Sequence, residues 1–80
     1  MDWIRVKHLE NKYLREKESL INKNKIEMLN AVLDASYTKE KGVDVYQVLI
    51  SWDTYWLFMT DDQIRDLENQ LGVNIPKGKF

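Results

Sequence analysis

The chain has 80 residues, with 12 lysines and arginines against 13 aspartates and glutamates, one histidine and no cysteine. This length allows one small core, and the absence of cysteine excludes a disulfide scaffold and a cysteine zinc site. The longest apolar run, residues 55–59, is far shorter than the roughly 20 residues that a membrane-spanning helix needs. We therefore predict a single domain over 1–80 with no metal, no other cofactor and no membrane association.

Residues 1–35 are predicted to be a helical region. No glycine or proline occurs between Asp2 and Ala35, and four apolar residues have spacings compatible with one helical face: Val6, Leu9, Tyr13 and Leu20. This stripe ends after Leu20, where Asn24 and Glu27 have the form of a capping box. The region is therefore either one long helix or a helical hairpin. A single helix of about 50 Å could not be covered by the rest of the domain and would favour a homodimer.

Residues 36–59 are predicted to be strands of a small antiparallel sheet. The run from Val43 to Ile50 is rich in β-branched residues, and a second apolar run covers residues 55–59. These two strands would be joined near Asp53, and residues 36–40 could add a third, outer strand. The competing interpretation is a helix capped by Asp44, which would make the chain all-α. We favour strands because Val, Ile, Tyr, Trp and Thr are frequent here.

Residues 60–72 are predicted to be a helix, followed by a tail over 73–80. Thr60 and Gln63 have the spacing of a capping box, the two acidic residues after Thr60 complement the helix dipole, and Gly72 supplies the stop. An apolar stripe follows one face of this helix: Ile64, Leu67 and Leu71. The predicted fold class is α+β: an N-terminal helix or helical hairpin, a two- or three-stranded antiparallel sheet and a C-terminal helix.

Charged and aromatic residues are unevenly distributed along the chain. Residues 1–41 carry nine basic and seven acidic side chains, whereas residues 43–71 carry one basic and six acidic side chains together with five of the nine aromatic residues. Tryptophan and tyrosine are enriched at interaction hot spots, and an acidic rim steers a protein towards basic partners. The predicted partner-binding residues are Trp52, Asp53, Tyr55, Trp56, Asp61 and Asp62.

No catalytic or metal-binding constellation is predicted, and we expect that the protein is not an enzyme. His8 follows Lys7 in the predicted helical region, where we expect an exposed histidine without a chemical role. The carboxylates of Asp61, Asp62 and Asp66 are expected to form a solvated helix face. Cation sites need several oxygen ligands that converge from shaped loops, and no further acidic motif or histidine joins these three.

The leading functional hypothesis is a small binding protein that regulates or inhibits a larger protein with a basic surface. We expect it in the cytoplasm, because the N-terminal residues resemble neither a secretory signal nor a transit peptide. The many lysines and asparagines are typical of A/T-rich coding sequences, as in low-GC bacteria and their phages.

Two alternative functions remain open. One is nucleic-acid binding by the basic N-terminal helix and the tail with Lys77 and Lys79. The other is a small-ligand site at a homodimer interface. We favour a protein partner over nucleic acid, because the basic residues of the first 41 positions are interspersed with acidic ones.

Overall fold

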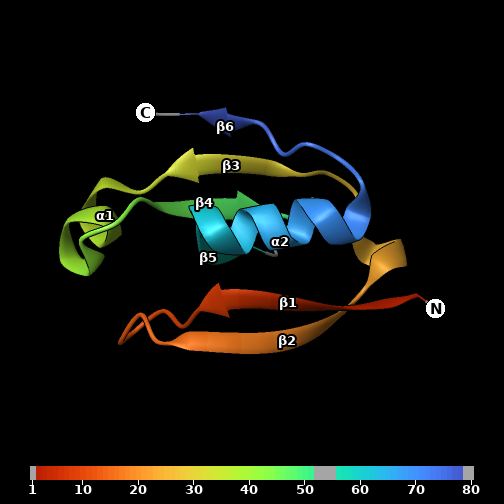
Figure 1. The fold of residues 1–80 in the computed structure, drawn as a ribbon, viewed down its shortest axis with the longest axis horizontal. Helices are drawn as coiled ribbons and strands as arrows, with labels where there is room; N and C mark the ends of the chain where they lie inside the picture. Colours follow the sequence, from red (N-terminus) through yellow and green to blue (C-terminus); the bar gives the residue numbers. More distant parts are fainter. Residues whose placement is uncertain (1, 52–55, 79–80) are drawn as a thin grey trace.

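The computed structural model describes residues 2–51 and 56–78, and within these residues the chain forms a six-stranded mixed sheet and two α-helices (Figure 1). Along the chain the elements are β1 (Trp3–Leu9), β2 (Glu16–Asn22), the 3-10 turn η1 (Lys23–Lys25), β3 (Asn30–Leu33), α1 (Ala35–Lys41), β4 (Val45–Leu49), β5 (Trp56–Thr60), α2 (Asp61–Leu71) and β6 (Lys77–Gly78). In space the strand order is β2-β1-β5-β4-β3-β6. All neighbouring pairs are antiparallel except β3 and β6, which are parallel.

The predicted N-terminal helix or helical hairpin is wrong, and so is the all-α alternative. Residues 3–22 form the antiparallel β1–β2 hairpin, and residues 30–33 form β3. In β1 the side chains of Ile4, Val6 and His8 are buried and the residues between them are exposed, which is the period of two expected for a strand. All seven residues of β1 pair with β2. This long-range pairing outweighs the helical preference of the charged β2 sequence.

The predicted sheet of two or three strands is also wrong, although two of its strands are present. Strands β4 and β5 pair over five positions, from Val45 with Thr60 to Leu49 with Trp56. Their predicted junction near Asp53 lies outside the described residues. The other four strands of the sheet come from the segments predicted as the helical region and the tail.

Residues 36–40 belong to helix α1 and do not form the predicted outer strand. Asp34 caps this helix, because its Oδ1 accepts a hydrogen bond from the Tyr37 amide at 2.9 Å. Gly42, with a φ of 82°, ends it in the left-handed conformation that favours glycine. The capping residues at both ends therefore explain why this short segment is helical.

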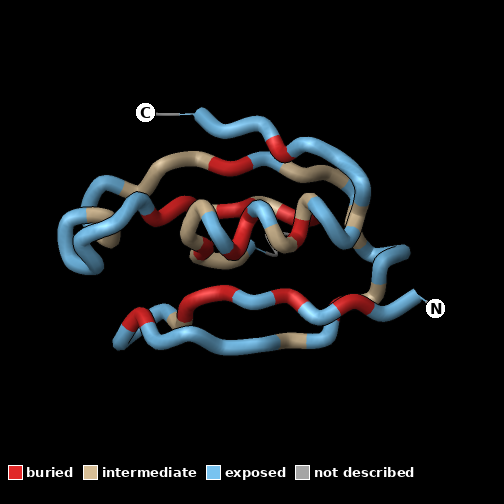
Figure 2. Tube along the Cα trace, viewed as in Figure 1, coloured by how far each residue is buried: buried red, intermediate tan, exposed pale blue. Residues whose placement is uncertain are grey.

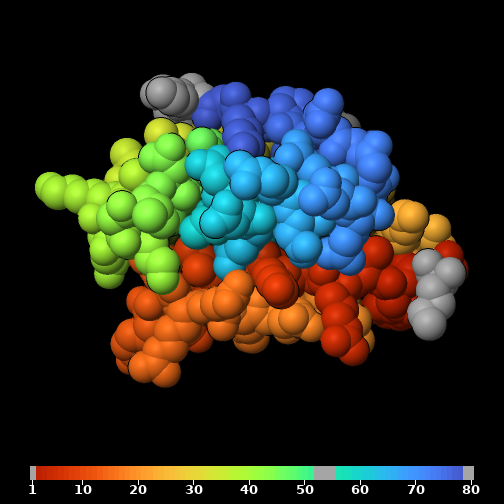
Figure 3. Space-filling view, in the orientation of Figure 1, coloured from red at the N-terminus to blue at the C-terminus, as the bar shows by residue number. Residues whose placement is uncertain are grey.

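Helix α2 confirms the predicted C-terminal helix. The Thr60 amide donates to Gln63 Oε1 at 3.0 Å in the predicted capping box, and Gly72 ends the helix with a φ of 70°. In Figure 1, α2 lies in front of the central strands β4 and β5. In Figure 3 its atoms form the middle of the visible surface and adjoin those of the hairpin. The following segment, predicted as a tail, returns along β3 and forms β6.

Apolar side chains pack on both faces of the sheet. The main core joins the hairpin, the central strands and α2, and the buried segments in Figure 2 follow these elements. Its buried members are Ile4, Val6, Ile21, Ala31, Tyr46, Val48, Ile50, Met59, Ile64, Leu67 and Ile75. A smaller cluster on the other face contains Leu9, Leu14 and Val45, with Tyr37 and Phe58 packed against it. Helix α1 and the β1–β2 loop thus cover only one end of that face.

The sheet is weakly joined between β1 and β5. Leu9 and Phe58 are the one residue pair that links these strands within the described chain. Helix α2 bridges the opening further along β1, where Gln70 Nε2 donates to the Arg5 carbonyl at 2.6 Å. The hairpin therefore diverges from the central strands towards its open end.

His8 is buried, which corrects the prediction of an exposed histidine. It is 6% exposed, its Nε2 lies 2.8 Å from Ser19 Oγ, and its Nδ1 lies 3.2 Å from the Leu9 carbonyl. The alternation of buried and exposed residues along β1 turns this side chain to the interior, where it meets Ser19 of β2. Both ring nitrogens have hydrogen-bonding partners there, as buried polar groups require.

Replacing Ser19 by alanine should lower the free energy of unfolding by about 1–3 kcal/mol, because His8 Nε2 loses its partner in a buried position. The double variant His8→Leu/Ser19→Ala should recover most of this loss, since neither polar group remains. Urea unfolding followed by circular dichroism measures both. Ser36→Ala, at an exposed position of α1, is the control. Equal effects of Ser19→Ala and Ser36→Ala would contradict the role of the hydrogen bond.

Candidate functional site

Strands β3, β4 and β5 present an apolar surface on the sheet face that points away from α2. The register pairs Val32 with Gln47 and Leu49 with Trp56, so these four side chains lie on one face. Within the described chain, Val32, Leu49 and Trp56 belong to neither cluster of packed apolar residues. We call Val32, Gln47, Leu49 and Trp56 the open face.

Trp56 is the most exposed side chain of the open face. Half of its surface is accessible, and its ring contacts Phe58 with the ring centroids 5.9 Å apart. Phe58 is itself covered by Tyr37 of α1, whose ring lies at 4.6 Å in an edge-to-face arrangement. One edge of the indole is therefore supported by a packed aromatic pair, and the rest is available for contact.

The open face is uncharged, and its polar group is fixed in position. Gln47 Nε2 donates to Asp34 Oδ2 at 2.7 Å, and Asp34 is held by its role as the cap of α1. This hydrogen bond leaves Gln47 Oε1 as an acceptor beside the apolar side chains. The surface thus combines one oriented acceptor with an apolar centre.

The structure separates the predicted partner-binding residues. Three of them lie outside the described part of the chain: Trp52, Asp53 and Tyr55. Trp56 begins β5 and belongs to the open face, whereas Asp61 and Asp62 follow the other end of β5, in the first turn of α2. Trp56 and the two aspartates therefore do not form one surface.

Asp61 and Asp62 have partners within the fold. Asp61 Oδ1 accepts from Lys77 Nζ at 2.8 Å, and Asp62 Oδ1 lies 3.3 Å from Arg65 Nη1. The hydrogen bond with Asp61 raises the pKa of the Lys77 ammonium group. Burial, together with the negative charge of Asp61, raises the pKa of the Tyr46 phenol. Asp61 therefore ties β6 to the start of α2.

Val32 and Leu49 were not predicted as site residues. Leu49 belongs to a run that is apolar on both faces of its strand, and such a run does not show which face a helix covers. The sequence does indicate that one face of the sheet is left without this helix. The C-terminal helix has a single apolar stripe of Ile64, Leu67 and Leu71, which can cover only one face of a sheet.

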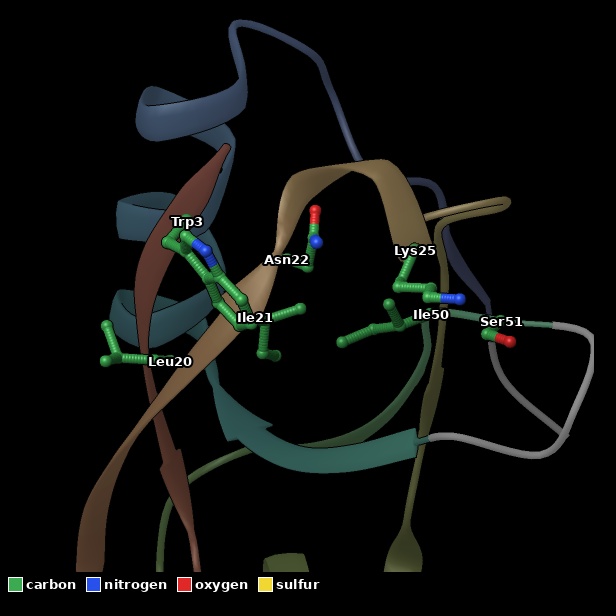
Figure 4. A pocket seen from close by; sticks show the side chains of 7 residues that line it. All are labelled: Trp3, Leu20, Ile21, Asn22, Lys25, Ile50 and Ser51. Atoms are coloured by element: carbon green, nitrogen blue, oxygen red, sulfur yellow. The ribbon is translucent and has the colours of Figure 1, made fainter. Parts of the chain in front are cut away.

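A pocket of about 470 Å³ lies between the open end of the hairpin and the end of β4 (Figure 4). Its apolar walls come from Trp3, Leu20, Ile21 and Ile50. Asn22 and Lys25, at the end of β2 and in η1, add polar groups, and Ser51 follows Ile50 at the edge. None of these residues was predicted as a site residue, because they come from segments far apart in the sequence.

No functional assignment comes from metal-ligand geometry or from similarity. Across residues 2–51 and 56–78, no group of three or more histidine, aspartate or glutamate side chains could hold a metal ion. The helices in this described part of the chain are too short or too polar to cross a membrane. Comparison with protein-family models, with curated proteins and with solved structures finds no match to this chain.

Proposed function

We propose that this chain is a small binding protein that regulates a larger protein by docking the open face on it. The observation that carries the proposal is the half-exposed Trp56 in an uncharged apolar surface that lies outside both packed clusters of the described chain. The centres of protein interfaces are depleted in charged residues and enriched in aromatic ones. Tryptophan is also among the residues that contribute most to binding energy.

The energy available from Trp56 is that of a typical hot spot. Burying the exposed half of an indole removes on the order of 100 Å² from water, which corresponds to roughly 2–3 kcal/mol. Phe58 restrains the ring before binding, so less conformational freedom is lost when a partner covers it. Gln47 Oε1 supplies an acceptor for a donor at the edge of the partner surface.

The partner surface that fits is apolar rather than basic. Asp61 and Asp62 pair with Lys77 and Arg65, so their charges are partly balanced within the fold. The open face itself contains no charged residue. We therefore propose an apolar patch with one hydrogen-bond donor as the complementary surface.

Trp56→Ala should weaken binding of the partner by about 10- to 100-fold, because each 1.4 kcal/mol corresponds to a factor of ten. The wild-type chain, Trp56→Ala and the control Tyr13→Ala serve as parallel baits in extracts of the native host, with quantitative mass spectrometry. Tyr13 is 64% exposed in the loop between β1 and β2. A protein retained by the wild type and Tyr13→Ala but lost from Trp56→Ala is then purified and titrated directly.

Two results would overturn the proposal. One is a partner that binds Trp56→Ala as tightly as the wild type while circular dichroism shows both folded. The other is a concentration-dependent dimer in sedimentation that Trp56→Ala dissociates, because a second copy of the chain would then occupy the open face.

A further inference from the structure

The pocket between the hairpin and β4 shares no residue with the open face and has firmly placed walls. The Lys23 amide donates to the Asp2 carbonyl, which fastens η1 to the start of β1. The amides of Glu27 and Met28 donate to the Ile50 carbonyl at 3.1 and 3.2 Å, which fastens the next segment to the end of β4. Backbone hydrogen bonds therefore hold both sides of the pocket in place.

The apolar surface of the pocket has a buried base and an accessible side. Ile21 and Ile50 are 6% and 1% exposed and belong to the main core, whereas Trp3 and Leu20 are 56% and 63% exposed. Figure 4 shows Trp3, Leu20 and Ile21 on the hairpin side and Ile50 on the other side. The volume of about 470 Å³ falls within the roughly 300–1,000 Å³ of small-molecule sites.

Asn22 and Lys25 both bring side-chain hydrogen-bond donors to the pocket lining. Asn22 Oδ1 already accepts from the Asn24 amide at 2.9 Å as the cap of η1, so the amide group Nδ2 is left to donate. Lys25 is the charged residue of the pocket lining, and no ion pair of its ammonium group occurs within the described residues. An ammonium group without an ion pair among the described residues, beside an apolar surface, matches a carboxylate.

We propose that this pocket binds a small organic acid with an apolar body. The body lies against Trp3, Leu20 and Ile50, and the carboxylate accepts a hydrogen bond from Lys25 Nζ. Both parts of the ligand are required, because an exposed charge pair alone contributes little in water. The apolar body supplies affinity by covering side chains that are now in contact with solvent.

The test compares three probes with the same eight-carbon body: octanoate, octanol and octylamine. Each is titrated into the purified chain, and two-dimensional ¹H–¹⁵N NMR reports the affinity and the position of binding. We expect octanoate to bind most tightly and octylamine least tightly, with saturable shifts at Trp3, Leu20, Asn22, Lys25 and Ile50. No partner protein is needed, so the outcome is independent of the proposed function.

Substitutions separate the roles of charge and apolar contact. Lys25→Gln should weaken octanoate binding by about 2- to 5-fold and leave octanol binding unchanged. Lys23→Gln is the matched control, because it removes the same charge from η1 at a residue that does not line the pocket. Leu20→Ala should weaken octanoate and octanol alike, and the fold should be retained because Leu20 is exposed and lies outside the main core.

Three outcomes would overturn this proposal. The first is the absence of saturable shifts with octanoate at millimolar concentration. The second is equal binding of octanoate and octylamine, or shifts centred on Trp56 instead of the pocket. The third is an equal effect of Lys23→Gln and Lys25→Gln, which would mean that net charge and not a defined site attracts the acid.

Discussion

Replacing Ile64 by alanine should lower the free energy of unfolding by about 2–5 kcal/mol. Ile64 is fully buried in the main core, where α2 packs between the hairpin and the central strands. The substitution removes apolar contacts and leaves a cavity that its neighbours fill only in part. Small domains have a total stability of about 5–15 kcal/mol, so this loss is a large share of it. Urea unfolding followed by far-ultraviolet circular dichroism measures the change.

The neighbouring Arg65 provides the control on the same helix. Its ion pair with Asp62 spans 3.3 Å between exposed groups, so Arg65→Ala should change stability by no more than about 0.5 kcal/mol. If Ile64→Ala is already unfolded without urea, Ile64→Val keeps the test measurable, with an expected loss of about 0.5–1.5 kcal/mol. Equal, small effects at positions 64 and 65 would show that α2 does not pack in the core as described.

The C-terminal helix is predictable because its determinants are local. Thr60 and Gln63 cap each other within one turn, and Gly72 ends the helix through its own backbone conformation. Strands β4 and β5 are also indicated by their β-branched and aromatic residues. Their place in the middle of the sheet is not predictable in this way, because their outer neighbours β1 and β3 come from a segment with helical spacing.

The hairpin shows why the N-terminal prediction fails. Residues 3–20 contain two apolar periodicities at once: the helical spacing of Val6 and Leu9, and the alternation of Ile4, Val6 and His8. Local sequence does not decide between them. Pairing with β2 decides, and β2 itself has only Ile21 buried among its seven residues. Its strand character therefore comes from hydrogen bonding to β1 rather than from an apolar pattern of its own.

The two candidate sites differ in how far the sequence reveals them. The sequence predicts Trp56 as a contact residue because aromatic and acidic residues are concentrated around it. Its position on the open face depends on the register with Leu49. The pocket was not predicted, because Trp3, Lys25 and Ile50 meet only after the hairpin has folded next to β4. Sites assembled from distant segments require the topology, and here the predicted topology was wrong.

The largest effect in a loop is expected at Leu14, where burial and backbone conformation compete. Leu14 has a φ of 53°, in the left-handed region that is unfavourable for leucine by about 1–2 kcal/mol. It is nevertheless 3% exposed, packs with Leu9 and Val45, and its carbonyl accepts from Lys41 Nζ at 3.1 Å. These contacts hold the β1–β2 loop against α1 and stabilise the unfavourable conformation.

Leu14→Ala should therefore lower the free energy of unfolding by about 2–5 kcal/mol, because it removes the buried side chain and keeps the conformational strain. Leu14→Gly removes the same contacts but also the strain, so it should be at least as stable as Leu14→Ala. In a helix or strand, glycine is instead less stable than alanine by about 0.5–1 kcal/mol. The same two substitutions at Leu20, within strand β2, should show the usual order, with glycine less stable than alanine. Urea unfolding of the four variants tests this reversal. A glycine variant that is less stable than the alanine variant by the same margin at both positions would contradict the left-handed conformation of Leu14.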